Sequence, residues 1–295
     1  MNKTASMLDR ILYRSDAEGL QEYALCGSGK TLVFLHGLGG TARYWACRLS
    51  EAQPKGHMIF LDLLGFGNSP RPLGNYTIER HVSALHDTLQ KHERIVLVGH
   101  SLGAAIALVY AARYPQNIEA LVLISLPAFR SEKGAYQWFR RTPSGWLLTN
   151  MVVVGFGCII TRRVVGKFLP FFLPDYPREV VEDVAKHNVF SATTSLWNVL
   201  FNHDISKDAE KLSADIPVLC IHSEDDDSAP YVNVQDLSRQ STNWTLHTVN
   251  GVGHHPWLWA TQACVQSIDE FLASIDHGEN ENAPAGRSSV ADQSS

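Results

Sequence analysis

The stretch Gly99–Gly103, GHSLG, places Ser101 between two glycines and has the clearest chemical potential in the chain. It lies between an apolar run, IVLV, and a helical pattern that is rich in alanine. A strand, a sharp turn and a helix in this order lift a serine hydroxyl above the end of a sheet, and the strained turn needs small neighbours. Ala104 and Ala105 add to that room, and the start of the helix stabilises negative charge. The pattern predicts that Ser101 is a nucleophile.

A serine hydroxyl becomes reactive when a base removes its proton. The chain has 13 histidines, so chain order and local context must select among them. His254 stands in the segment NGVGHHP, directly after the last apolar run. A loop with two glycines at this place would bring His254 to the carboxyl edge of a sheet. In sheets of parallel strands, functional sites lie at that edge. We predict that His254 is the base and that His255 points elsewhere.

A base of this kind is oriented by a carboxylate. The run Ser223–Pro230, SEDDDSAP, offers four carboxylates after another apolar run, and it lies between Ser101 and His254 in the chain. Consecutive residues cannot all face one metal ion, and the chain has neither a calcium-loop spacing nor an HExxH motif. We therefore predict no metal site, and we expect one carboxylate of this run to hold His254 while the others are solvated.

Short apolar runs that alternate with helical patterns must position these residues. The runs are almost continuously apolar, which predicts strands that are buried on both faces of a mostly parallel sheet. The predicted strands are Thr31–Leu35, His57–Leu61, Ile95–Val98, Ala120–Ile124, Ile216–Ile221 and Trp244–Val249. The predicted helices are Thr77–Lys91, Leu102–Tyr114, Val232–Gln240 and Leu258–Ser274. This alternation predicts a doubly wound α/β fold.

The alternation stops in the middle of the chain, where aromatic residues, prolines and helical patterns occur without a convincing strand. We predict an inserted, mainly helical cap at residues 128–210. The core would then consist of residues 1–127 and 211–276. Residues 277–295 are polar and are predicted to form a disordered tail.

Taken in order, these motifs resemble those of the α/β-hydrolase superfamily, in its serine-nucleophile, lid-bearing branch. Phe34–Gly40 resembles the HG oxyanion loop of that family, and Asp62–Ser69 resembles its D-x-x-G-x-G-x-S turn. Gly99–Gly103 is similar to the nucleophile elbow, and Gly253-His254 is similar to the histidine loop. The resemblance covers about residues 32–127 and 216–272, and it implies an α/β-hydrolase fold with an inserted cap.

The resemblance also implies which carboxylate is the acid. In this family the acid usually stands four residues before a proline, and counting back from Pro230 gives Asp226. Ser223 stands where the family has glycine, so Asp225 stays open as a second candidate.

Further roles follow from the same resemblance. The backbone N–H groups of Leu38 and Leu102 would form the oxyanion hole. His36 and His100 lie inside the motifs, and we expect them to be structural or to line the substrate pocket. Trp257 is another pocket candidate, although a tryptophan in this place is more often a packing residue.

The implied function is a serine hydrolase that cleaves an ester, lactone or thioester of a largely apolar, lipid-like small molecule through an acyl-enzyme. No metal or organic cofactor is implied. Two alternatives stay open. One is a carbon–carbon bond hydrolase of a diketone-type substrate on the same triad, and the other is a non-catalytic ligand-binding member of the superfamily.

Composition bears on partners and location. The net charge of −5 disfavours a nucleic-acid partner. Five scattered cysteines and no signal-like apolar segment at the N-terminus predict a cytoplasmic protein.

From Ala128 to Pro170 the chain is apolar and has seven basic residues and one acidic residue, a net charge of +6. This segment either packs over the site with its charges in water or contacts an anionic membrane surface. The oligomeric state is not predicted.

Overall fold

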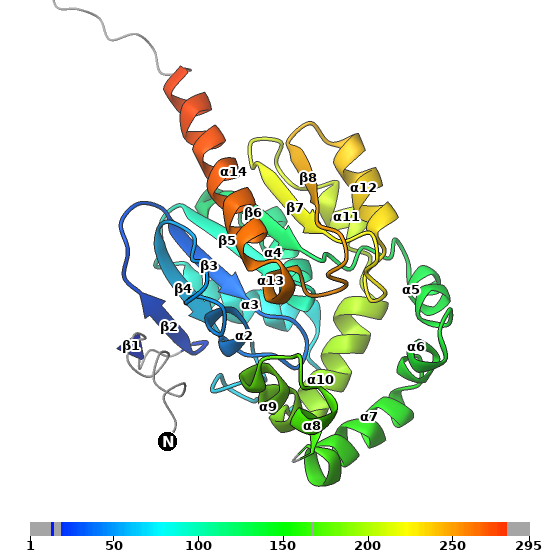
Figure 1. Cartoon of the computed structure of the whole chain (residues 1–295). Helices are drawn as coiled ribbons and strands as arrows, with labels where there is room; N and C mark the ends of the chain where they lie inside the picture. Colours follow the sequence, from blue (N-terminus) through cyan, green and yellow to red (C-terminus); the bar gives the residue numbers. More distant parts are fainter. Residues whose placement is uncertain (1–12, 15–18, 167, 282–295) are drawn as a thin grey trace, which may run out of the picture.

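A single eight-stranded sheet runs through the computed structural model, which describes residues 13–14, 19–166 and 168–281 (Figure 1). The strand order is β1-β2-β4-β3-β5-β6-β7-β8. The strands from β4 to β8 in this order are parallel, whereas β1 and β2 pair in an antiparallel way at one edge. Their bounds are β1 Tyr13–Arg14, β2 Glu22–Leu25, β3 Thr31–Leu35, β4 His57–Leu61, β5 Ile95–His100, β6 Ile118–Ile124, β7 Val218–His222 and β8 Trp244–Thr248. The predicted α/β fold with a mostly parallel sheet is confirmed.

Helices cover both faces of this sheet. One face packs against α3 Ile78–Leu89, α4 Leu102–Arg113 and α12 Tyr231–Gln240, and the short helix η1 Pro115–Asn117 leads from α4 into β6. The other face packs against α2 Arg43–Ala46, α13 Pro256–Trp259 and α14 Thr261–Glu281. Successive side chains of a strand point to opposite faces. Leu97 of β5 therefore joins one core cluster and Val98 the other, which explains the continuous apolar runs.

The sheet differs from the prediction at its two edges. The antiparallel strands β1 and β2 were not predicted, because Glu22–Leu25 is only partly buried and has no continuous apolar run. Strand β8 was expected to be buried on both faces, but it is an edge strand in which Trp244 is buried and the other four residues are not. Edge strands have fewer neighbours to cover them, so their patterns are weaker.

The last predicted helix is also different. Instead of one helix from 258 to 274, the chain forms α13 and α14, with a break at Ala260, whose φ of −136° and ψ of 47° are not helical. Helix α14 continues to Glu281, five residues into the predicted tail, because each residue that extends a formed helix gains a hydrogen bond. The rest of the predicted tail lies outside the described residues.

Between β6 and β7 the described chain is helical and has no strand. It forms α5 Glu132–Phe139, α6 Pro143–Leu148, α7 Met151–Ile160, the π-helical turn η2 Thr161–Val165, α8 Leu169–Phe172, α9 Arg178–Lys186, α10 Val189–Ser195, the π-helical η3 Leu196–Phe201 and α11 Ser206–Ala209. Since β6 pairs directly with β7, these helices form an excursion from one continuous sheet. We call residues 128–210 the helical insertion.

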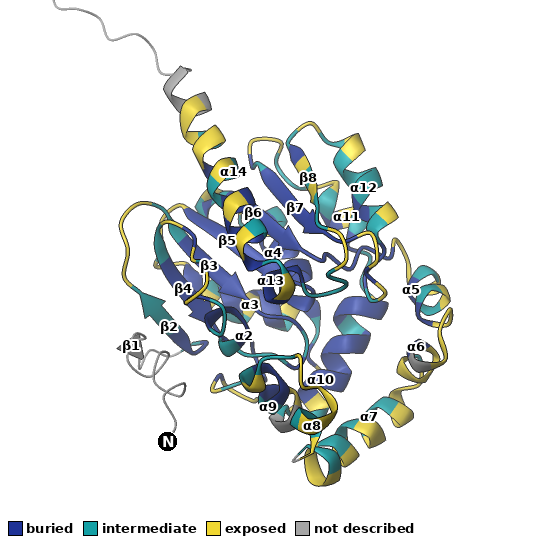
Figure 2. Cartoon of the chain, viewed as in Figure 1, coloured by how far each residue is buried: buried dark blue, intermediate teal, exposed yellow. Residues whose placement is uncertain are grey.

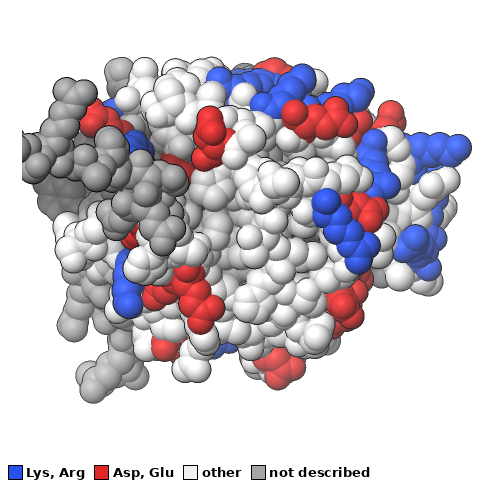
Figure 3. All heavy atoms as spheres, turned by 90° about the horizontal axis from the view of Figure 1, so that it is seen from above, with Lys and Arg blue, Asp and Glu red and all other residues white. Residues whose placement is uncertain are grey.

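Burial differs between the sheet and the insertion. Figure 2 shows buried residues in the sheet and the helices against it, and exposed residues along α6, α7 and α8. On the face seen in Figure 3, Lys and Arg gather toward one side, and the central area carries neither sign of charge. Among the described helices, none has both the length and the apolar content to cross a membrane. All five cysteines are free thiols.

Candidate active site

Ser101 lies at the sharp turn between β5 and α4. Its φ of 52° and ψ of −116° are strained for a residue with a side chain. A Cβ atom on Gly99 would lie 2.5 Å from the carbonyl oxygen of Gly103, and one on Gly103 would lie 2.3 Å from that of Leu35. Only glycine fits at these two positions, which explains the composition of the GHSLG turn.

A chain of hydrogen bonds leads from this serine to the acidic loop. The Oγ atom of Ser101 lies 2.9 Å from Nε2 of His254. Nδ1 of His254 lies 2.9 Å from Oδ2 and 3.0 Å from Oδ1 of Asp226. With the proton on Nδ1 donated to the carboxylate, Nε2 is free to accept the serine proton. The arrangement can therefore activate a hydroxyl for attack on a carbonyl carbon.

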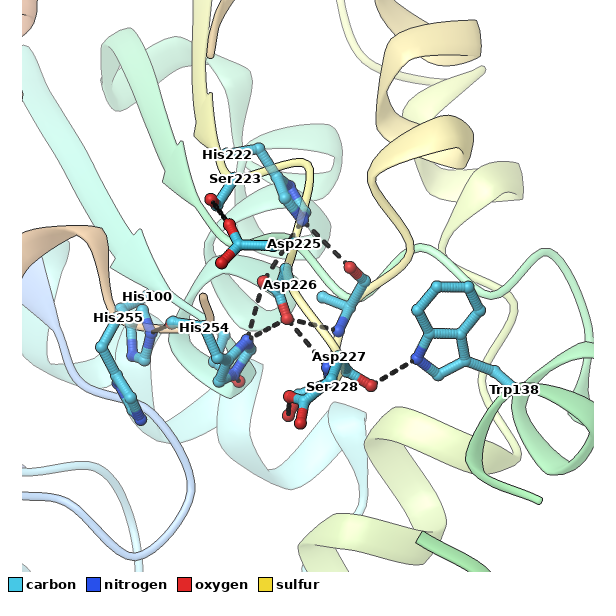
Figure 4. Close-up of polar contacts among 12 residues, drawn as sticks. His100, Trp138, His222, Ser223, Asp225, Asp226, Asp227, Ser228, His254 and His255 are labelled. Carbon is cyan, nitrogen blue, oxygen red and sulfur yellow. Dashed lines mark hydrogen bonds and ion pairs between the residues drawn. The ribbon is translucent and has the colours of Figure 1, made fainter. Parts of the chain in front are cut away.

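Asp226 is buried but well supplied with donors. Oδ1 accepts hydrogen bonds from the N–H groups of Ser228, at 2.9 Å, and Ala229, at 2.8 Å. Nε2 of His222 lies 3.3 Å from Oδ2, on the side away from His254 (Figure 4). Burial by itself would raise the pKa of Asp226, but the hydrogen bonds from His222 and His254 outweigh it and hold this pKa well below its usual range. The carboxylate is therefore charged at neutral pH.

The neighbouring carboxylates have other positions. Glu224, Asp225 and Asp227 are exposed. The Ser223 hydroxyl donates to Oδ1 of Asp225, which also accepts from the N–H of Gly251 at 3.2 Å. The hydrogen bond from Ser223 is the main cause that lowers the pKa of Asp225. The structure thus brings Asp226 to His254, and it uses Asp225 to tie the acidic loop to the histidine loop.

The histidine loop is fixed by a second group of rings. His100 donates from Nε2 to the carbonyl oxygen of His254 over 2.8 Å and stacks on Tyr44, with 4.6 Å between ring centroids. His255 points toward Tyr44 instead of Ser101, and its Nδ1 lies 3.4 Å from the phenol oxygen. Burial, followed by the charge of His254, lowers the pKa of His255 to about 3 and that of His100 well below its usual value. Both are therefore neutral, structural side chains at neutral pH.

His36 anchors the loop that follows β3. Its Nδ1 donates to the carbonyl oxygen of Gly37 over 2.8 Å, and its Nε2 accepts from the N–H of Leu63 over 3.0 Å. The bond that Nε2 accepts needs a neutral ring, and burial lowers the pKa of His36 to about 4. The Gly37 oxygen also accepts from the N–H of Gly40 over 3.1 Å. Two donors therefore fix the orientation of this peptide plane.

The same peptide plane carries the N–H of Leu38, which points away from the Gly37 oxygen because the peptide is planar and trans. Gly37 is close to the serine, since a Cβ on it would lie 3.3 Å from Cβ of Ser101. Leu102 is the first residue of α4, where an N–H has no partner within the helix. In the described part of the chain neither the Leu38 nor the Leu102 N–H has an acceptor. These two groups can therefore receive an oxyanion next to Ser101.

The predicted pocket residues lie deeper than expected. Trp257 is fully buried, donates to the carbonyl oxygen of Trp45 over 3.0 Å and packs against Phe34, so its prediction as a pocket residue is wrong. The reason is that α13 turns this ring into the core cluster behind the histidine loop. His36 and His100 have structural roles in the loops beside Ser101, the first of the two alternatives predicted for them.

Four residues that support the site were not predicted. His222 ends β7 immediately before the acidic loop, and that position is the only signal in the sequence that could have identified it. Asp62 lies in the recognised turn and accepts from the N–H groups of Ala42 and Asn68, each over 2.8 Å. Trp138 of α5 donates to the carbonyl oxygen of Asp227 over 2.8 Å. Tyr44 comes from α2. The contacts of Trp138 and Tyr44 join segments that are far apart in the sequence, and such contacts leave no local pattern.

Comparison with known proteins gives consistent relatives. The family described as "alpha/beta hydrolase fold" matches residues 30–261. Lipase 3 of Moraxella sp. (strain TA144) is 34% identical over 257 residues, covering 83% of this chain and 78% of that protein. The human 1-acylglycerol-3-phosphate O-acyltransferase ABHD5 is 24% identical, covering 84% of this chain and 79% of that protein. A thermophilic esterase from Thermogutta terrifontis superposes with a TM-score of 0.65 at 19% identity, covering 87% and 94% of the two chains. At that identity, the last likeness concerns the fold alone.

Proposed function

Because the chain belongs to the alpha/beta hydrolase fold family, a hydrolase family with lipase- and esterase-like members, we propose that it is a serine hydrolase that acts through an acyl-enzyme on Ser101. The observation that carries this proposal is the hydrogen-bonded chain Ser101–His254–Asp226, in which both distances at His254 are 2.9 Å. A family of this kind hosts many chemistries, so the site and not the fold supports the assignment.

In the proposed reaction the Oγ atom of Ser101 bonds to the acyl carbon while its proton passes to Nε2 of His254. Asp226 stabilises the imidazolium that forms. The N–H groups of Leu38 and Leu102 bind the oxyanion, and in known cases one such donor contributes about 3–4 kcal/mol. His254 then protonates the leaving alcohol. Water attacks the acyl-enzyme, gives one proton to His254 and releases the carboxylic acid and the free serine.

The substrate class that we propose is an ester with a largely apolar acyl or alcohol part. A relative named a lipase, at 34% identity over most of both chains, supports this class. The helical insertion supports it as well, since it supplies an unusually apolar surface next to the core.

We also propose that the helical insertion is the cap of the site, over a core of residues 1–127 and 211–276. Contacts at both ends support this role. Near its start, Trp138 donates to the carbonyl oxygen of Asp227, the neighbour of Asp226. Toward its end, the carboxylate of Asp183 in α9 accepts from Thr41, at 2.5 Å, and from Arg43, at 2.7 Å, shortly after the loop of Leu38.

Fluorophosphonate labelling tests the chemistry. We expect the wild-type protein to be labelled on Ser101 and the Ser101→Ala variant to be unlabelled. A folded wild-type protein that does not react would count heavily against a serine hydrolase and would favour a ligand-binding role. A series of p-nitrophenyl esters then tests the substrate class, because a strong preference for acetate over longer acyl chains would contradict an apolar pocket.

A further inference from the structure

The helical insertion exposes most of the large apolar side chains that are exposed in the described residues. Of the 19 large apolar side chains that are exposed in the described residues, 14 lie between Trp146 and Leu173. Val152 is 79% exposed, Phe156 64% and Phe171 80%. We call this set, on α6, α7, η2 and α8, the apolar surface. Figure 2 shows these elements as a mostly exposed arm of the molecule.

A surface of this composition is unusual on a protein that meets only water. Helix α7, MVVVGFGCII, has no charged residue, and none of its residues is buried. A helix that is apolar all round is normally covered on its whole circumference. Large contiguous apolar patches on soluble proteins mark contacts with a partner or a membrane. We therefore expect a partner or a membrane to cover the apolar surface.

Uncompensated positive charge accompanies the apolar surface. Arg140 and Arg141 lie just before α6, Arg162 and Arg163 lie in η2, and all four are exposed. Within the described ranges none of the four forms an ion pair with a carboxylate. The guanidinium groups of Arg140 and Arg141 instead lie over the rings of Tyr136 and Trp138, at 5.5 Å and 4.2 Å from the ring centroids. From Ala128 to Pro170 the net charge is +6, in a chain whose total is −5.

We propose that the apolar surface binds an anionic lipid bilayer, with its phenylalanine, valine and tryptophan side chains in the interfacial layer and the four arginines at lipid phosphates. Helices that combine apolar and basic residues lie in this way in the plane of a membrane. Basic residues close to such a surface are attracted by the anionic headgroups. A second copy of the chain fits less well, because a two-fold contact would bring the same basic residues of both copies together.

Binding of the apolar surface to a bilayer would also bring the candidate active site close to the membrane. Trp138 ties α5 to the acidic loop, and Asp183 ties α9 to the segment after the oxyanion loop. The arm between these two ties thus approaches the bilayer while its ends adjoin the loops around Ser101. Delivery of a lipid-like ester to Ser101 rests on the proposed function, whereas the binding itself does not.

Co-sedimentation of the full chain with vesicles tests the proposal. We expect binding to phosphatidylglycerol vesicles at low salt and much weaker binding to phosphatidylcholine vesicles. The double variant Arg162→Gln/Arg163→Gln should bind anionic vesicles at least about tenfold more weakly, since each basic residue near the surface contributes severalfold. Lys211→Gln/Arg239→Gln removes the same charge from exposed positions outside the insertion, and it should bind as the wild type does.

A second pair of variants tests the apolar contribution. Phe156→Ser/Phe171→Ser should lower binding at least about fivefold, because two large apolar side chains would no longer be buried in the interfacial layer. The protein should stay folded, because both side chains are exposed. The matched control is Leu73→Ser/Val232→Ser, at side chains that are 95% and 62% exposed elsewhere, and it should bind normally. Thermal unfolding of all four variants checks that the fold is retained.

Three outcomes would overturn the proposal. The first is that the wild type does not bind anionic vesicles at low salt. The second is that vesicle binding is weakened equally in the insertion variants and in their controls. The third is that the chain forms a stable dimer that binds no vesicles, and that light scattering shows this dimer to dissociate in Phe156→Ser/Phe171→Ser. Ser101→Ala should bind vesicles like the wild type. Its binding therefore separates a failure of this proposal from a failure of the proposed chemistry.

Discussion

Asp225 and Asp226 are adjacent in the chain but lie in opposite environments. Asp226 is buried and has four groups within hydrogen-bonding or ion-pairing distance, namely two backbone N–H groups and two histidine rings. Asp225 is exposed and contacts Ser223 and Gly251. A charge in a buried site interacts far more strongly with a neighbouring imidazolium than one in water does. The two carboxylates should therefore differ in their effect on the reaction.

We predict that Asp226→Asn lowers kcat for a p-nitrophenyl ester by about 10⁴-fold, because an amide favours the wrong tautomer of His254 and cannot stabilise its charged form. Asp225→Asn keeps a hydrogen-bond acceptor at an exposed position, and it should lower kcat by less than about threefold, as is usual for surface substitutions. Steady-state kinetics of both variants check this. A larger loss of kcat in Asp225→Asn than in Asp226→Asn would identify Asp225 as the residue that orients His254.

His222 is expected to act as a positioning residue through Asp226. Its Nε2 lies 3.1 Å from the carbonyl oxygen of Ala229 and 3.3 Å from Asp226, and its ring is fully buried. His222→Phe should lower kcat about tenfold with KM unchanged, since a hydrogen bond to a charged group contributes about 1.5–3 kcal/mol.

His222→Gln provides the control for this prediction, because an amide N–H can replace Nε2 as donor. We expect it to restore most of kcat. Equal kcat losses in His222→Phe and His222→Gln, or a loss that appears only in thermal stability, would assign the histidine to packing alone.

At the scale of single residues, local motifs predict the site better than its surroundings. Ser101, His254 and Asp226 stand in short patterns with fixed neighbours, and the structure brings these three together. Trp257 was predicted to line the pocket but is buried in the core, because its sequence neighbours do not reveal which way α13 turns the ring. His222 was missed because its contact with Asp226 exists only once the loop after β7 has folded back.

At the scale of elements, the elbow depends on close approach between β5 and α4. Gly103→Ala should lower both stability and kcat, because the new methyl group would lie 2.3 Å from the Leu35 oxygen and 2.6 Å from the His36 oxygen. Strain of this kind typically costs about 1–3 kcal/mol. Thermal unfolding and ester hydrolysis measure the two effects together.

Gly157→Ala is the matched control for the elbow substitution. Gly157 lies within α7, and nothing lies within 4 Å of the position that its Cβ would take. Alanine is favoured over glycine inside a helix by about 1 kcal/mol. We therefore expect unchanged activity and a slightly higher melting temperature. A stable, active Gly103→Ala variant would contradict the close approach at the elbow.

The bounds of a helix or strand were predicted best where the element is most fully buried. The central strands β3 and β4 have the predicted bounds, because continuous apolar runs mark strands that are covered on both faces. Strand β2, which lies beside the edge strand β1, was missed, and so was the break at Ala260, whereas the burial of the edge strand β8 was misjudged. Their form depends on what covers them, and a single sequence does not contain that information.

At the scale of the whole molecule, burial of neutral histidines links the fold to pH. Burial lowers the pKa of His36 to about 4 and that of His81 to about 3, and it is also the main cause that lowers the pKa of His255 to about 3. In the unfolded chain each would titrate near 6.5. Between these values the unfolded state binds more protons than the folded state, so stability falls as the pH falls. The lowered pKa of Asp226 acts in the same direction, because the stability that it contributes is also lost as the pH falls, but only below about pH 4.

We therefore predict that the free energy of unfolding falls steeply between pH 6.5 and pH 5, by up to about 2 kcal/mol for each such histidine. Urea unfolding at a series of pH values measures it. His81 is the informative position, because its Nε2 lies 2.9 Å from Oγ of Ser195, a contact that glutamine can replace, and it lies outside the triad. His81→Gln should reduce the slope of stability against pH by up to about 1.4 kcal/mol per pH unit, whatever its stability at pH 7. Equal slopes in wild type and variant would mean that His81 is protonated in the folded protein, and a stability that is flat from pH 7 to pH 5 would contradict the burial of all three rings as neutral groups.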